Sequence, residues 1–536
     1  MSSEQNIQAE AAARSAWAPF GYRAFVVLWT ATVISSVGTW MHDVGAGWLM
    51  TELSPSPAVV AAVQAATTLP IFLFALLAGA VADLVDKRKL LITVNCLMAV
   101  VAATLAIVVW QERMTPILLL LFTFLMGTGA AFSAPAWQAI VPKLVERKDL
   151  SSAIALNSMG INISRAIGPA LAGFLIVAIG LTTPFALNAL SFIGIIAALL
   201  WWRSSAQVSS GLPREHVGGA IRAGLGYAWN SLPVRSTLVR AGAFFLFASA
   251  YWAMLPLIAR QVLEGGPTLY GLLLAAVGVG AVLGALILPK LRTRFDANVI
   301  VAVGTAGTAT VLCVFAAAPI QSLAITASLF AGLFWIAVLS SLHVSAQTAL
   351  PDWVRARGLS IFLTVFFGAM ALGSLVWGQI ATQFSIPFAL LTAALGAVLL
   401  IPLTWPFKLG LGERLDLTPS SHWPEPVIDG SGPAKTDGPV MIQVEYHIAP
   451  EQQEEFLSLV AELARSRKRH GAYHWQLMRD AENATHMTEV WFEASWTEHL
   501  RHHERVTEDD KHIQQRIHEL HQAQHPDSDQ ALPKVT

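Results

Sequence analysis

The sequence predicts an all-α membrane protein with twelve spanning helices, followed by a small α+β domain. Hydrophobic residues make up 54% of the 536 residues and charged residues 13%, about half of the usual charged share. From residue 22 to residue 407, the chain falls into apolar stretches long enough to cross a hydrocarbon core of about 30 Å. This pattern excludes a soluble enzyme for most of the chain.

The twelve predicted spans form two groups of six. The polar stretch 203–236 separates them, which gives predicted halves at 22–202 and 237–407 and leaves 1–21 as an N-terminal tail. The even number of spans places the tail and the region after residue 407 on the same side. The spans are expected near 22–49, 58–83, 89–110, 116–141, 152–179, 184–202, 237–262, 268–290, 298–318, 321–349, 359–383 and 386–406.

Lysine and arginine are concentrated in the turns after the second, fourth, eighth and tenth spans, with Arg113 and Arg260 as exceptions. Because cations are enriched on the cytoplasmic side, both termini are predicted to be cytoplasmic. In the central polar stretch, Ile221, Leu225 and Trp229 recur at helical spacing and predict a helix on the membrane surface. The cations of the four turns are Lys87, Arg88, Lys89; Lys143, Arg147, Lys148; Lys290, Arg292, Arg294; and Arg355, Arg357.

The two halves repeat the same pattern of small and polar residues. After a slip of about one helical turn relative to the polar positions, Gly168 and Gly173 align with Gly373 and Gly378. Parallel six-helix repeats build a large class of secondary transporters, whose substrate cavity lies between the halves. The polar matches, 209 positions apart, join Gln138, Pro142, Val145, Leu150 and Ser151 to Gln347, Pro351, Val354, Leu359 and Ser360.

The region after the last span changes character. Residues 408–437 are rich in proline, glycine and serine and predict a linker, 438–525 predict a soluble domain, and 526–536 a disordered tail. The domain is expected to have three strands and two helices, with Gly471 ending the first helix and Ser495 and Glu498 capping the second. On that second helix, His499 and His503 are four residues apart; we interpret it as a solvated polar helix and predict no metal site.

Several motifs resemble the major facilitator superfamily, most closely its drug-antiporter group of transmembrane secretion effectors. They are Gly79-xxx-Asp83, the Gly168-Pro169 pair with Gly173, Pro135 to Pro142, and Gln347 to Arg355. The group includes the enterobactin exporter and macrolide efflux proteins. The region from Pro439 is similar to a C-terminal extension that looks related to ferredoxin-like monooxygenase domains. The chain departs from the family's turn motif at Leu84 and Asp86.

The resemblance implies a secondary active transporter that exports a small organic molecule across the bacterial inner membrane by alternating access, coupled to proton antiport. A drug, a siderophore or another secondary metabolite would be its substrate. It needs no cofactor and no nucleic acid, and the C-terminal domain could form a homodimer. Two alternatives stay open: a lysophospholipid flippase, and a membrane-tethered, cofactor-independent monooxygenase.

Ionisable residues inside spans are the first candidates for function. Asp43, beside His42, could carry a proton, or both could lie above the hydrocarbon. Arg165 could face the interior and attract an anion, or reach the membrane edge. The turn residues form a candidate conformational latch, although a solvated acid and the positive-inside rule would also explain them; they are Gly79, Asp83, Lys87 and Arg88.

Other polar and aromatic residues are candidates for the cavity lining, with helix packing as the alternative for each. Gly168, Pro169 and Gly173 are expected to pack the halves closely. The lining candidates are Gln64, Trp137, Gln138, Asn157, Asn162, Trp252, Trp335, His343 and Trp377.

Overall fold

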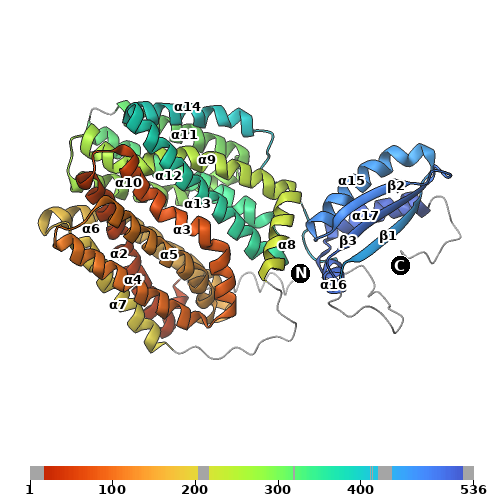
Figure 1. Cartoon of the computed structure of the whole chain (residues 1–536), viewed down its shortest axis with the longest axis horizontal. Coiled ribbons are helices and arrows are strands. Elements are labelled where there is room, and N and C mark those ends of the chain that lie inside the picture. The colour runs from red at the N-terminus through yellow and green to blue at the C-terminus, as the bar shows by residue number, and fades with distance from the viewer. Residues whose placement is uncertain are drawn as a thin grey trace. The chain divides into compact units, whose positions relative to one another are not determined.

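The computed structural model describes residues 17–202, 217–317, 320–410, 412, 415–420 and 438–522, without the side chains of 80, 83, 84 and 217–221. The chain divides into two compact units (Figure 1). The first unit comprises Met1–Leu212, Arg240–Ser341 and Leu363–Pro406 and holds most of the helical bundle. The second comprises Pro213–Val239, Leu342–Phe362 and Phe407–Thr536 and holds the C-terminal domain.

Six long helices form the N-terminal half, as predicted. Prolines at the first turns of three of them lack the N–H that a helix start leaves unbonded. Asp86 accepts a hydrogen bond from the Lys89 N–H at 2.8 Å and so caps the third. The helices are α2 (Arg23–Leu53), α3 (Pro57–Leu84), α4 (Lys87–Trp110), α5 (Pro116–Ile140), α6 (Leu150–Ala178) and α7 (Thr183–Trp201).

Six more helices form the C-terminal half, so the described chain has the twelve expected spans. Two helices begin earlier than predicted, because the first turns of α9 and α13 contain arginine (Arg235 and Arg355) and precede the continuous apolar stretch. α13 begins at Asp352 rather than 359, and α9 at Leu232 rather than 237. The helices are α9 (Leu232–Leu257), α10 (Pro267–Arg292), α11 (Ala297–Ala317), α12 (Gln321–Thr348), α13 (Asp352–Gln383) and α14 (Ile386–Thr404); a π-helical turn, Ile258–Val262, extends α9.

The repeated glycines occupy equivalent places in the two halves. A side chain at Gly168 would meet Trp40 and the Val37 carbonyl of α2, and one at Gly373 would meet Ser249 and the Leu246 carbonyl of α9. The pair α6 and α2 and the pair α13 and α9 therefore make equivalent glycine contacts. Gly173 then abuts α10, and Gly378 abuts Pro57, Ala58 and Ala61 of α3, so both glycines join one half to the other.

The central polar stretch contains the predicted helix, α8 (Val217–Asn230). It buries Tyr227 and Ala228, whereas Leu225 is 49% exposed and Trp229 is 76% exposed. The two exposed side chains belong to the predicted apolar stripe, as expected if this stripe faces lipid.

The C-terminal domain contains an antiparallel sheet in the order β1-β3-β2, with α15 and α17 contributing to one core. Gly471 has a φ of +112° directly after α15, and Ser495 accepts a hydrogen bond from the Glu498 N–H, so both predicted caps are present. A ferredoxin-like fold has four strands, whereas the described residues form three strands and end in α17. The elements are β1 (Val440–His447), α15 (Gln453–Arg469), β2 (Tyr473–Arg479), β3 (His486–Glu493), α16 (Trp496–Arg505) and α17 (Glu508–Gln522).

Part of the predicted linker is bonded to the domain that it precedes. The Ser420 N–H donates to the Val506 carbonyl at 2.9 Å, and the Glu508 N–H donates to the Thr418 carbonyl at 3.0 Å. Residues 416–420 thus lie against the junction of α16 and α17. Residues 421–437 are outside the described residues.

Candidate transport site

Arg165 lies inside the bundle, on the stretch of α6 that packs against α2. Its guanidinium carbon is 5.5 Å from the centre of the Trp40 ring, which is a cation–π distance. The Nε atom is buried and bonds to no described residue. Tyr251 of α9 is close enough to interact with the guanidinium electrostatically. This places a cation with spare donors next to helices of both halves.

The backbone around Arg165 explains how α10 comes so close. Pro169 has no N–H, so the Arg165 carbonyl loses its usual helical partner. That carbonyl lies against Gly278 of α10, and the Pro169 carbonyl lies against Gly271. Gly173 faces Pro267 and Thr268 in the same way. Pro169 and Gly173 therefore lie at a contact between the halves, whereas Gly168 packs against α2 of its own half and not between the halves as expected.

Asp43 lies on the stripe of α2 that faces the C-terminal half. Its carboxylate interacts electrostatically with the hydroxyl group of Tyr270 in α10. The Tyr270 hydroxyl also lies against Gly47, one helical turn further along α2. No described side chain forms an ion pair with Asp43, so the structure does not bring Asp43 and Arg165 together as a salt bridge.

His42 points away from Asp43, into the N-terminal half. It is 1% exposed, and its ring contacts Phe185 of α7 edge-on with centroids 5.2 Å apart. Neither ring nitrogen bonds to a described residue. Successive residues of a helix point about 100° apart, so His42 and Asp43 face different neighbouring helices.

Trp252 and Trp335 belong to an aromatic cluster of the C-terminal half. Their rings are 5.3 Å apart, and Trp335 also contacts Tyr251 and Phe245. Trp377 instead donates from its indole to the Leu246 carbonyl at 2.7 Å. The cluster includes Tyr251, so it adjoins the residue that interacts with Arg165.

Most of the other lining candidates form hydrogen bonds within or between neighbouring helices. The Trp137 indole donates to the Asn157 side chain at 3.2 Å, which joins α5 to α6. Asn162 donates to the Ser158 carbonyl of its own helix. Gln138 is exposed and Gln64 partly exposed. In the second unit, His343 pairs with Gln347 at 3.1 Å and contacts the ring of Phe362.

A contact that the sequence did not indicate joins the halves at the ends distant from the cation-rich turns. Arg260 donates to the Thr51 hydroxyl at 2.9 Å and lies over the Trp48 ring at 5.6 Å. Between α3 and α13, the Ala58 N–H donates to the Thr382 hydroxyl at 2.8 Å. The one signal in the sequence was Arg260 itself, a cation on the side where cations are rare.

The turn after α3 contains the residues of the candidate latch. No described atom lies within 4 Å of a Cβ placed on Gly79, so this glycine is not at a close helix contact. Arg88 donates to the carbonyls of Leu199 and Leu200 at 2.7 and 2.9 Å, where it caps α7. The side chain of Asp83 is outside the described residues, and Lys87 begins α4.

The predicted solvated helix of the C-terminal domain is buried on one face, which corrects that interpretation. His499 and His502 are 2% and 1% exposed, and each contacts the buried Glu493 carboxylate, at 3.0 and 2.6 Å. The core face of β3 carries Glu493, so α16 must supply donors to it. Burial alone would raise the pKa of Glu493, but the charges and hydrogen bonds of His502 and His499 hold it well below the usual value.

A second carboxylate of the same sheet face is equally well bonded. Glu489 accepts hydrogen bonds from the Tyr446 hydroxyl at 2.8 Å and the Trp475 indole at 2.7 Å, and Arg467 lies 3.5 Å away. Among the described residues, no group of three or more His, Cys, Asp or Glu side chains converges as a metal site. Both carboxylates are therefore bonded by side chains of the domain itself.

The second unit also joins the domain to the turn between α12 and α13. The Trp353 ring lies 4.3 Å from the guanidinium carbon of Arg505 and 5.9 Å from the ring of His470. On another side it meets Tyr227 of α8 edge-on at 5.8 Å. Burial raises the pKa of Tyr227 to about 12. Three segments distant in sequence therefore share one aromatic contact.

Twelve spans in two similar halves, joined through glycine contacts around interior charges, define a secondary transporter of the major facilitator type. The chain belongs to the family of transmembrane secretion effectors, whose pattern matches residues 14–532.

Relatives with known roles are similar over most of the bundle. The staphyloferrin A transporter of Staphylococcus aureus is 26% identical over 358 residues, which cover 65% of this chain and 87% of that protein. The multidrug efflux pump Tap of Mycobacterium tuberculosis is 24% identical over 418 residues, covering 75% and 97%. The enterobactin exporter EntS of Salmonella choleraesuis is 24% identical, covering 65% and 83%.

Solved structures share the fold. A mutant of the nucleoside transporter NupG matches with a TM-score of 0.59 at 14% identity, over 72% of this chain and 100% of its own. A bacterial homologue of the human lysosomal transporter Spinster, in an inward-facing and unoccupied conformation, matches with a TM-score of 0.55 at 14% identity, over 72% and 95%. At this identity, the likeness concerns the fold alone.

Proposed function

We propose that this protein exports a small organic molecule, such as a siderophore or a drug, across the bacterial inner membrane by proton-coupled alternating access. Relatives named for siderophore transport and for drug efflux support this substrate class. Both termini are cytoplasmic in this proposal, as the distribution of lysine and arginine predicts.

One observation carries the proposal: the halves are joined at one end. Arg260 with Thr51, Ala58 with Thr382, and Thr268 with Gly173 all make contacts at the predicted periplasmic ends. At the opposite end of α3, Gly79 has no close neighbour among the described residues. This arrangement is expected of an inward-facing carrier, which must exchange these contacts for others to release its substrate outside.

Two interior charges receive distinct roles. Asp43 is the proton carrier, because it is the carboxylate of α2 that faces the other half and no described side chain neutralises it. Arg165 attracts an acidic group of the substrate, with the rings of Trp40 and Tyr251 beside it. We retain Asp83, Gly79 and Lys87 as a latch of the outward-facing state, with Arg88 fixing the end of α7.

The C-terminal domain is proposed to pair with a second copy. Met441 of β1 is opposite Phe492 of β3, which is opposite Tyr473 of β2, and together they form an apolar row on the face of the sheet away from the core. Met441 and Tyr473 are 41% and 37% exposed. Phe492→Glu should reduce the oligomeric state of the full chain in light scattering, whereas an unchanged mass would remove this face as the contact.

Transport by purified protein in vesicles tests the proposed function. An imposed proton gradient should drive accumulation of a siderophore or a drug dye, and Asp43→Asn should lose this accumulation. If lysophospholipid crosses instead, without a soluble substrate, the protein is a flippase. Oxygen-dependent conversion of a substrate that requires residues 438–536 would favour the monooxygenase alternative.

A further inference from the structure

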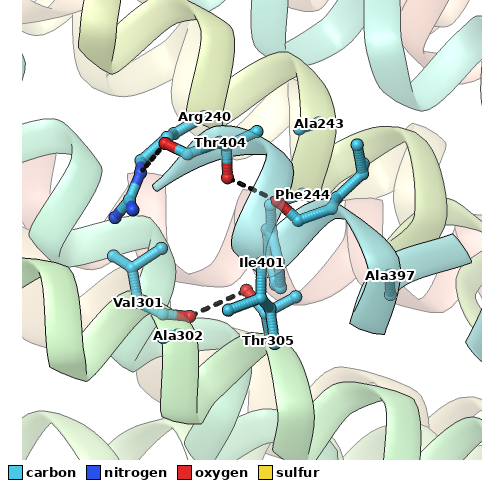
Figure 2. Close-up of a pocket in the computed structure, with 10 residues that line it drawn as sticks. Arg240, Ala243, Phe244, Val301, Ala302, Thr305, Ala397, Ile401 and Thr404 are labelled. Carbon is cyan, nitrogen blue, oxygen red and sulfur yellow. Dashed lines mark hydrogen bonds between the residues drawn. The ribbon is translucent and has the colours of Figure 1, made fainter. Parts of the chain in front are cut away.

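A small crevice lies between α9, α11 and α14 of the C-terminal half (Figure 2). Its walls are mostly aliphatic, and Arg240 is the single charged residue among those that line it. The other lining residues are Ala243, Phe244, Val301, Ala302, Thr305, Ala397, Leu400, Ile401 and Thr404.

Arg240 is more deeply buried than an arginine of a membrane helix usually is. It is 3% exposed, and its Nε donates to the Thr404 carbonyl at the end of α14, at 3.2 Å. The guanidinium carbon lies 5.6 Å from the Trp405 ring. The Nη1 atom is buried and bonds to no described residue. Capping α14 therefore uses one donor and leaves another without a partner.

The hydroxyl groups of the crevice do not supply that partner. Thr404 donates to the Leu400 carbonyl and Thr305 to the Val301 carbonyl, each within its own helix (Figure 2). No described carboxylate forms an ion pair with Arg240, although Asp296 is near enough to act electrostatically. Burying a cation without an ion-pair partner among apolar side chains costs free energy unless an anion binds to it.

The helices that form the crevice show lipid-facing surfaces. On α11, Val303 is 58% exposed, and on α14, Leu399 and Leu403 are 54% and 67% exposed. Arg240 lies near the start of α9, on the side of the cation-rich turns. An occupant that reaches Arg240 from this surface must combine an apolar body with a negative head.

We propose that the crevice binds an anionic phospholipid of the cytoplasmic leaflet, with its phosphate on the Arg240 guanidinium and an acyl chain along Val301, Ala397 and Ile401. Basic pockets between membrane helices on this side suit such headgroups. The site is separate from the proposed proton and substrate residues. An experiment can therefore disprove lipid binding without disproving export, and an experiment can disprove export without disproving lipid binding.

The test is native mass spectrometry of the detergent-purified full chain, titrated with short-chain phosphatidylglycerol, with short-chain phosphatidylcholine, or with inorganic phosphate. We expect one phosphatidylglycerol to bind preferentially and Arg240→Gln to weaken it roughly tenfold or more, the loss of a charge-assisted hydrogen bond. Equal binding of phosphatidylcholine would overturn the proposal. Phosphate alone binding as tightly as the lipid would make this a site for a free anion and would also overturn it.

Two variants keep the result interpretable if Arg240→Gln unfolds α14. Ala302→Phe fills the crevice but retains Arg240 and its bond to Thr404, and it should also abolish selective lipid binding. Arg235→Gln removes an exposed arginine from the same helix and should leave binding unchanged. Binding by Ala302→Phe as strong as that of the unaltered chain would contradict the assignment.

Discussion

The helical bundle and the C-terminal domain hold their buried charges in different ways. In the bundle, Asp43, Arg165 and Arg240 form no ion pair with any described residue. In the domain, Glu489 and Glu493 each accept several hydrogen bonds from tyrosine, tryptophan or histidine.

The difference distinguishes buried charges that take part in transport or binding from buried charges that stabilise the fold. Burying a charge without a full set of partners costs free energy. Its presence in the bundle therefore indicates a partner that binds reversibly, such as a proton, a substrate or a lipid. A carboxylate that accepts several hydrogen bonds inside a core stabilises one arrangement of that core, and removing it leaves its donors without an acceptor. Bundle substitutions should therefore alter activity, and domain substitutions should alter stability.

The largest effect is expected at Asp43. Asp43→Asn removes the titrating group and should reduce proton-driven transport to the level of empty vesicles, with normal insertion and unfolding temperature. Glu52→Gln, at an exposed carboxylate of the same helix, is the matched control. Transport by Asp43→Asn that keeps its dependence on pH would remove Asp43 from the mechanism.

In the domain, Glu493→Ala should lower the free energy of unfolding by about 3–5 kcal/mol, because His499 and His502 lose their acceptor inside the core. Denaturant titration followed by tryptophan fluorescence of the full chain measures this, alongside hydrogen exchange of β3. Glu451→Ala, at an exposed position, should change little. A stable Glu493→Ala domain would mean that the network is not structural.

The stability of the domain should also fall with acid. Burial, with the nearby charge of His502, lowers the pKa of His470 to about 3, whereas the unfolded chain titrates near 6.5. Between these values the unfolded state binds more protons, so stability is lost as pH falls from about 6.5, by up to about 1.4 kcal/mol per pH unit. Hydrogen exchange of α15 between pH 7.5 and 5 should show this. His470→Gln should make the stability less dependent on pH. An equally steep pH profile in that variant would assign the dependence to other groups.

The smallest effect is expected where the halves meet. Arg260→Gln loses the bond to Thr51 and should weaken the closed periplasmic end by about 1 kcal/mol, roughly fivefold in the ratio of the two states. Spin-label distances across that end measure the ratio. Arg113→Gln, an exposed arginine predicted on the same side, is the control. If both variants leave the distances unaltered, Arg260 does not hold the halves together.

Sequence alone could predict the spans, because the length and polarity of a segment decide whether it crosses a membrane. It also predicted the contact of Gly173 with the other half, because a glycine lets two helices approach closely. It could not predict which neighbour each side chain meets. His42 and Asp43 are adjacent in sequence but face different helices, and His499 is buried because Glu493 lies beneath α16. Such pairings depend on tertiary packing, which hydropathy and spacing do not encode.

The contact of Trp353 with Arg505 and His470 has a practical consequence. Indole emission responds to nearby cations, so this tryptophan is a built-in optical reporter at the junction between a helix-connecting turn and the appended domain. With Trp353→Phe as the blank, the difference in emission during turnover would follow that junction in time without any attached dye.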